Sequence, residues 1–60
     1  MTTKCTFKEI GIDEYFKIGS SEFLKCKYIV GYGNAINSRT QLNCTIKDDF
    51  VVTRIYKKLH

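Results

Sequence analysis

The chain has no proline and no tryptophan, and its single histidine, His60, is the last of its 60 residues. Proline lacks the backbone N–H group, so its absence leaves the amides of the chain free to donate to strand ladders. No proline-rich linker divides the sequence either. Sixty residues suffice for one domain and are too few for two hydrophobic cores. We therefore expect a single domain that spans residues 1–60.

Cysteine is also scarce, and the spacing of Cys5, Cys26 and Cys44 suits neither a disulfide framework nor a zinc site. Secreted frameworks normally pair an even number of cysteines, and structural zinc requires four closely spaced ligands. The opening MTTKCTFKEI has no apolar stretch of the kind found in a signal peptide. We therefore expect free thiols in a reducing cytoplasm, with no metal and no cofactor.

Long apolar runs are missing as well. None approaches the roughly 20 residues that a membrane-spanning helix needs, which predicts a soluble protein with no membrane contact. A chain this short buries only about 60% of the surface that it exposes when unfolded, so its margin of stability is thin. Domains of this size often gain stability from a partner, and homo-oligomerisation therefore stays open.

Positive charge is in excess. Ten Lys and Arg residues stand against six Asp and Glu residues, which gives a formal net charge of +4 and a pI near 9.1. A small basic surface attracts polyanions such as nucleic acid, or an acidic protein face. A net charge of this size is also ordinary for a soluble small domain. The magnitude alone does not distinguish these interpretations.

The apolar residues alternate with polar ones, which is the period of a β-strand and not that of a helix. Turn residues such as GSS at 19–21 and KDD at 47–49 separate the alternating segments. The expected strands are residues 14–18, 22–30, 34–37, 41–46 and 50–55.

Strict alternation assigns one face of each expected strand to the core. In the longest strand it points Leu24, Cys26 and Tyr28 inward, and it points Phe23, Lys25, Lys27 and Ile29 outward with both lysines in water. The other residues expected inside are Phe16, Ile18, Ile36, Leu42, Cys44, Ile46, Val51, Thr53 and Ile55. Val52 and Arg54 are expected outside.

The segment before these strands has a helical pattern. Phe7 and Ile10 are three residues apart, Thr6 and Glu9 form a capping-box pair, and Gly11 follows as a stop signal. We expect a short helical turn here. Together with five tightly connected strands it predicts a mostly β fold: a small, strongly bent, antiparallel barrel.

Catalytic constellations are missing. His60 is terminal, and the adjacent carboxylates at 13–14 and 48–49 would point to opposite faces of a strand or cap turns. An enzyme needs a nucleophile or metal with a base within hydrogen-bond reach. We therefore expect a protein that is not an enzyme.

Residues 28–46, YIVGYGNAINSRTQLNCTI, contain the densest set of turn residues. Gly31 and Gly33 permit positive φ, and NSRT is typical of a hairpin turn. The two glycines lack the third glycine and the Lys-Ser pair of a phosphate-binding loop. Turn formation accounts for this stretch except for Tyr32 and Arg39, whose residue types are frequent anchors at interfaces.

The order of these features resembles a loose group of short phage-encoded proteins that are predicted to form small SH3-like barrels. The resemblance rests on Phe7, GIDEYF at 11–16, EFLKC with Lys25, NAI at 34–36 and DDFVVTRI at 48–55. It covers almost the whole chain, although its motifs are short and structural. The chain departs from the group in the looser GIDEYF and in NSRTQ, which lacks the common turn glycine. The resemblance implies a five-stranded SH3-like barrel in the cytoplasm of a host cell, and no single activity.

Two functional hypotheses follow. In the first, exposed apolar residues contact a host protein, and the protein modulates or inhibits that host protein or a defence system, as the resemblance implies. In the alternative, basic and aromatic residues of the outer face bind single- or double-stranded nucleic acid. The candidate binding residues are Phe23, Lys25, Lys27, Ile29, Tyr32, Arg39, Arg54, Lys57 and Lys58.

Overall fold

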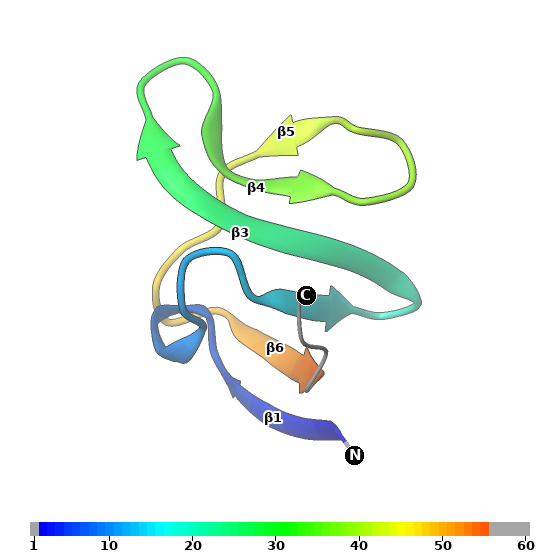
Figure 1. Cartoon of the computed structure of the whole chain (residues 1–60). Coiled ribbons are helices and arrows are strands. Elements are labelled where there is room, and N and C mark those ends of the chain that lie inside the picture. The colour runs from blue at the N-terminus through cyan, green and yellow to red at the C-terminus, as the bar shows by residue number, and fades with distance from the viewer. Residues whose placement is uncertain (1, 56–60) are drawn as a thin grey trace.

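The computed structural model describes residues 2–55, which form one open antiparallel sheet of six strands and a single 3₁₀ helix (Figure 1). The elements are β1 (Thr2–Thr6), η1 (Phe7–Glu9), β2 (Tyr15–Ile18), β3 (Ser21–Ile29), β4 (Gly33–Asn37), β5 (Asn43–Cys44) and β6 (Val51–Ile55). In space the strands follow the order β1-β6-β2-β3-β4-β5. The expectation of a mostly β, antiparallel chain is confirmed, and each of the five expected segments contains a strand.

Strand β1 was not expected from the sequence. It pairs with β6 along its whole length, from Thr2 opposite Ile55 to Thr6 opposite Val51. Its sequence TTKCT has little apolar alternation, so the strand depends on the β6 ladder and not on a buried face of its own. Within residues 2–55, the two outer strands β1 and β5 are not hydrogen-bonded to each other.

The short helix η1 confirms the helical turn expected at this position. The Glu9 carboxylate accepts hydrogen bonds from the backbone N–H of Thr6 at 2.8 Å and from the Thr6 hydroxyl at 3.0 Å. The N–H of Phe7 donates to the carbonyl of Phe50, and that of Lys8 donates to the carbonyl of Asp48, both at 2.9 Å. The helix is thereby tied to the segment that leads into β6.

The Glu9 carboxylate should make the fold weaker in acid. Hydrogen bonds from the Thr6 backbone and hydroxyl, aided by the charge of Arg54, lower the pKa of Glu9 below its ordinary value. A lowered folded-state pKa adds stability above the unfolded-state value, near pH 4.5, and this stability is lost as the pH falls through the folded-state pKa. Urea unfolding of wild type and Glu9→Gln should show a difference at pH 7 that shrinks between pH 4.5 and pH 2.5. A difference that stays constant over this range would contradict the prediction.

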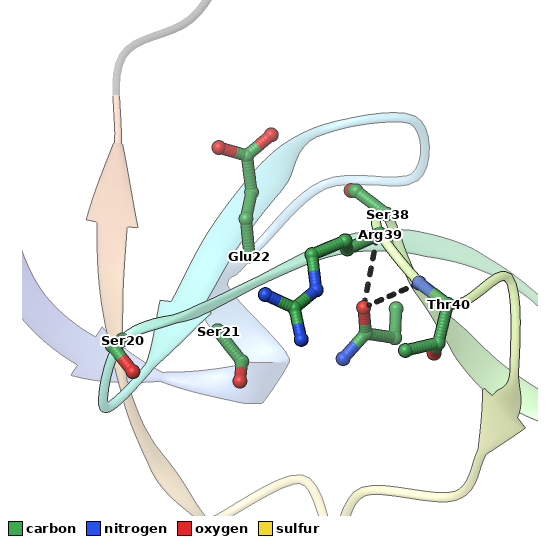
Figure 2. Close-up of a pocket in the computed structure, with 7 residues that line it drawn as sticks. Ser20, Ser21, Glu22, Ser38, Arg39 and Thr40 are labelled. Carbon is green, nitrogen blue, oxygen red and sulfur yellow. Dashed lines mark hydrogen bonds between the residues drawn. The ribbon is translucent and has the colours of Figure 1, made fainter.

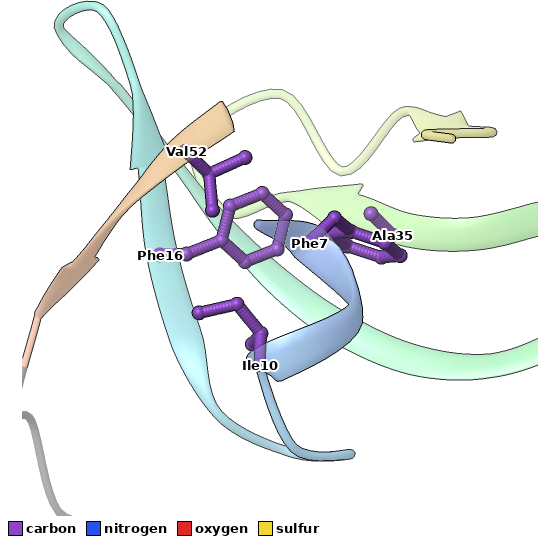
Figure 3. Packing of buried hydrophobic residues seen from close by; sticks show 5 residues of the cluster. All are labelled: Phe7, Ile10, Phe16, Ala35 and Val52. Carbon is purple, nitrogen blue, oxygen red and sulfur yellow. The ribbon is translucent and has the colours of Figure 1, made fainter. Parts of the chain in front are cut away.

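Five side chains form the buried core, and they come from the helix, from the residue that follows it and from three strands (Figure 3). The Phe7 and Phe16 rings meet edge to face with their centroids 5.3 Å apart, and Phe16 stacks on Phe23 at 5.5 Å. Such aromatic pairs contribute about 0.5–1.5 kcal/mol beyond their buried area. The five buried residues are Phe7, Ile10, Phe16, Ala35 and Val52.

Both outer strands contribute to this one core, which shows that the sheet is strongly bent. Cys5 of β1 and Cys44 of β5 pack against the same cluster, although four strands lie between them in the sheet order. The helix η1 supplies Phe7 to the centre of that cluster. The bend expected from the sequence is therefore present.

The predicted faces of β3 are wrong. Phe16 lies directly opposite Phe23, and directly opposed residues of an antiparallel pair share a face. Because Phe16 is fully buried, Phe23 faces the core with it, and Lys25 follows two residues later on the same face. Leu24 is therefore turned away from the core, opposite Ile36.

Two other strands show the same one-residue error. In β4 the buried side chain is that of Ala35 and not that of Ile36, and in β6 it is that of Val52 and not that of Val51. Alternation determines which residues of a strand share a face. Both faces of these two strands carry apolar side chains, so hydrophobicity does not show which face is buried. Among the other inward assignments, Phe16, Ile18, Cys44 and Ile46 are confirmed, whereas Leu42 is 68% exposed.

A bulge in β3 ends the alternation. Lys25 lies opposite Ala35 and Ile29 lies opposite Gly33, so four residue steps on β3 match two on β4. Extra residues in one strand bend it and redirect its side chains. Tyr28 lies within this bulge and is exposed, which corrects its predicted place in the core.

The helical content of the described residues is too small for a membrane span: none of their helices is long and apolar enough to cross a bilayer.

Candidate functional site

The most exposed apolar surface lies at the turn between β3 and β4. We call it the hairpin surface; its residues are Tyr28, Ile29, Val30 and Tyr32. Val30 is 82% exposed and Tyr32 is 65% exposed, and Figure 1 shows this turn projecting beyond the rest of the sheet. Single exposed apolar residues are common, but four of them within five consecutive residues are typical of an interaction site.

The backbone of the turn explains why these side chains face outward. The N–H of Tyr32 donates to the carbonyl of Ile29 at 2.9 Å, which closes the turn, and Gly31 has a φ of +88°. Glycine adopts a positive φ without the steric cost that a Cβ atom imposes. The closed turn and the β3 bulge together hold the hairpin surface away from the core.

An apolar groove runs beside the hairpin surface, with a volume of about 480 Å³. Its walls combine β3 residues with Ile36 of β4, which alternation turns away from the core. Lys27 carries the single charge among the lining residues of the described chain. The lining residues are Cys26, Lys27, Ile29, Tyr32, Gly33, Ile36 and Asn43.

Three of the predicted binding residues meet here. Lys27, Ile29 and Tyr32 all line the apolar groove. Lys27 and Ile29 were predicted on one face of β3 with Phe23 and Lys25, whereas Phe23 and Lys25 are directed inward. Tyr28 and Val30 complete the hairpin surface and were not predicted as binding residues. The apolar run YIV immediately before a turn glycine was the sequence signal that could have identified them.

Lys25 is half-buried and its amine points toward η1, not into solvent. Its Nζ atom donates to the backbone carbonyls of Phe7 at 3.0 Å and Ile10 at 2.7 Å, and it lies 4.3 Å from the centroid of the Phe7 ring. The charge therefore holds η1 against the sheet and is not available to a ligand. This corrects the prediction that Lys25 points to water.

Phe23 and Arg54 are likewise directed inward. Phe23 packs against the core, and the Arg54 guanidinium donates to the backbone carbonyl of Glu9. Lys57 and Lys58 lie outside the described residues. The basic and aromatic face that the sequence suggested is therefore not formed by Phe23, Lys25 and Arg54.

Arg39 belongs to a second, separate site. It lies in a polar hollow between the turn that joins β2 to β3 and the turn that follows β4 (Figure 2). The structure therefore divides the predicted binding residues between two ends of the β3–β4 hairpin.

None of the thiols within residues 2–55 is part of a disulfide. Cys5, Cys26 and Cys44 are free and partly buried. Burial, followed by the nearby Cys26, raises the pKa of the Cys44 thiol, so Cys44 stays protonated at neutral pH. Within residues 2–55, His, Cys, Asp and Glu form no group of three that could hold a metal ion.

The chain matches no known family model, and no curated protein or solved structure shows significant similarity to it.

Proposed function

We propose that this protein is a non-enzymatic binding module that uses the hairpin surface and the apolar groove to dock on another protein. The observation that supports this proposal is the projecting set of exposed apolar residues beside a groove lined by aliphatic and aromatic side chains. Tyrosine and apolar side chains around a groove are the usual anchors of protein interfaces.

The positive charge of the chain indicates that the partner surface is acidic. The chain carries a net charge of +4, and Lys27 places a positive charge in the lining of the groove. Two copies of the chain would bring these like charges together, whereas an acidic partner would pair with them. The expected partner is therefore a different protein, with an apolar contact patch bordered by carboxylates.

Nucleic acid is a weaker candidate because two of the cations expected on its contact face, Lys25 and Arg54, are directed inward. Binding to a phosphate backbone requires several outward cations along one surface. The amine of Lys25 and the guanidinium of Arg54 are instead engaged with backbone carbonyls around η1.

The finer parts of the proposal rest on the resemblance to short phage-encoded proteins. It supports an SH3-like barrel as the fold type, a host protein as the partner, and modulation or inhibition of that partner or of a defence system as the result. The bent sheet whose two outer strands share one core is compatible with such a barrel.

Removing the hairpin surface should abolish partner binding without unfolding the protein. We expect the double variant Val30→Ser, Tyr32→Ser to lose capture of its partner from nuclease-treated host lysate. With the purified partner, isothermal titration calorimetry should show binding at least about tenfold weaker, because buried aromatic anchors dominate interface energies. The matched control is Leu42→Ser, which replaces a residue that is 68% exposed and lies outside the groove.

Four outcomes would contradict the proposal. The double variant could retain its partner, or Leu42→Ser could lose it equally. Binding could instead require nucleic acid and fall steeply with salt. Loss of a self-associated species in the double variant, without loss of any other protein, would identify a second copy as the occupant.

A further inference from the structure

The polar hollow at the opposite end of the β3–β4 hairpin is independent of the hairpin surface. Strand β3 has nine residues, so its two ends are roughly 25 Å apart at about 3.3 Å per residue. The hollow has a volume of about 540 Å³, and its lining is mainly polar. The lining residues are Ser20, Ser21, Glu22, Asn37, Ser38, Arg39 and Thr40.

Asn37 organises one wall of the polar hollow. Its side-chain Oδ1 accepts hydrogen bonds from the backbone N–H groups of Arg39 at 2.9 Å and Thr40 at 3.1 Å. The backbone carbonyl of Asn37 accepts from the N–H of Gln41 at 2.8 Å, which closes the turn. Because Oδ1 is committed to the turn, the Asn37 Nδ2 group is left as a donor on a side chain that lines the hollow.

This wall is also fixed to β3. The N–H of Ser38 donates to the carbonyl of Glu22 at 2.9 Å, which joins the two sides of the hollow. These hydrogen bonds hold the backbone that carries Asn37 and Arg39 in one position relative to β3. Such preorganisation lowers the entropic cost of ligand binding.

The Arg39 guanidinium extends into the space between the two turns, with Ser20 and Ser21 on the opposite side (Figure 2). Within residues 2–55 it has no hydrogen-bond or ion-pair partner. Figure 2 shows the Glu22 carboxylate turned away from Arg39, and Glu22 lies opposite Lys17 on the neighbouring strand. The positive charge of Arg39 is therefore not neutralised by the one acidic residue of the hollow.

We propose that the polar hollow binds a phosphate group, with Arg39 and Asn37 donating from one wall and the hydroxyls of Ser20 and Ser21 donating from the other. The guanidinium offers paired donors that match two oxygens of an oxyanion. A carboxylate has two coplanar oxygens and would use one wall alone, whereas a tetrahedral phosphate presents oxygens to both walls. The observed donor arrangement therefore favours phosphate over carboxylate.

The source of the phosphate is either a small phosphate ester or a polynucleotide backbone. The small ester is favoured, because the hollow holds one unpaired cation and has a volume within the usual range for small-molecule sites. A polynucleotide would need further outward cations along the chain, and Lys25 and Arg54 are engaged elsewhere.

An NMR titration tests the proposal on the full chain at low ionic strength. Adenosine 5′-monophosphate should shift the amide signals of residues 19–22 and 37–41 in a saturable manner, whereas adenosine should leave them unchanged. Arg39→Gln should bind at least about tenfold more weakly, because it removes the charge-assisted bonds. Arg39→Lys should recover part of the affinity, since it restores the charge without the paired donors.

Lys47→Gln is the matched control, because Lys47 is an exposed cation outside the hollow. The affinity of this variant for adenosine 5′-monophosphate should stay within about twofold of the wild-type value. Equal shifts with adenosine would overturn the proposal, as would shifts spread over all lysine-bearing segments or full affinity in Arg39→Gln. A ten-nucleotide single-stranded DNA that binds more tightly through the same amides would support the phosphate site and assign its source to a polynucleotide.

Discussion

Gly33→Ala is expected to lower the free energy of unfolding by about 3 kcal/mol or more. Two effects combine at this position. Gly33 has a φ of +99°, which side chains with a Cβ rarely adopt. A Cβ atom built there would lie 2.2 Å from the carbonyl oxygen of Cys44, a backbone atom that cannot rotate away.

The loss should be large relative to the whole stability of the protein. A 60-residue domain has a total of about 3–9 kcal/mol at the usual value per residue. Relief of the clash would require β5 to separate from β4, and this pairing rests on Ala35 opposite Cys44 and Ile36 opposite Asn43. Much of the Gly33→Ala population should therefore be unfolded, or should lack the β4–β5 pairing.

Gly31→Ala is the matched control for this prediction. Gly31 also has a positive φ, +88°, but no atom lies within 4 Å of the Cβ that would be added. It should cost roughly 1–2 kcal/mol through backbone strain alone. Urea denaturation followed by circular dichroism measures both variants, and equal losses would show that the approach to Cys44 does not matter.

Lys25→Met is expected to destabilise the protein by about 2–4 kcal/mol. Hydrogen bonds from a charged donor contribute about 1.5–3 kcal/mol, and a buried carbonyl left without a donor adds a further cost. The Lys25 amine donates to the carbonyl of Ile10 and to that of Phe7. The Phe7 carbonyl also accepts from the N–H of Ile10. Methionine keeps a similar length and apolar stem but donates no hydrogen bond and carries no charge over the Phe7 ring.

Lys27→Met provides the comparison within the same strand. Lys27 is exposed, so its replacement should change the free energy of unfolding by less than about 0.5 kcal/mol. Chemical denaturation gives the two values, and the amide signals of residues 7–10 should shift in Lys25→Met alone. Equal stability of the two variants would mean that Lys25 does not anchor η1.

The contrast between these lysines shows the limit of reading faces from the sequence. Both side chains were expected to point into water, because lysine is usually exposed and because strict alternation could place both on the outward face of the strand. Phe23 and Lys25 share a face with Phe16, and this follows from the pairing of β2 with β3, which the sequence does not specify. The backbone carbonyls of Phe7, which begins η1, and of Ile10, which follows it, then make an inward lysine favourable.

The candidate site was predictable in part. Tyr32 and Arg39 were identified because turn formation did not explain them, and the structure places them in the apolar groove and the polar hollow. Tyr28 and Val30 were missed because the β3 bulge changes their direction, and a bulge leaves little trace in a single sequence.

By itself, the sequence determined the local structure: alternating segments that became strands, the Thr6–Glu9 pair that begins η1, and the glycines that turn the chain. These features depend on neighbours within a few residues, so local patterns contain them. Strand β1, the inward faces of β3, β4 and β6, and the separation of Tyr32 from Arg39 were decided only in the tertiary structure. Each depends on which distant strands pair and in what register, and a one-residue change of register exchanges the two faces of a strand.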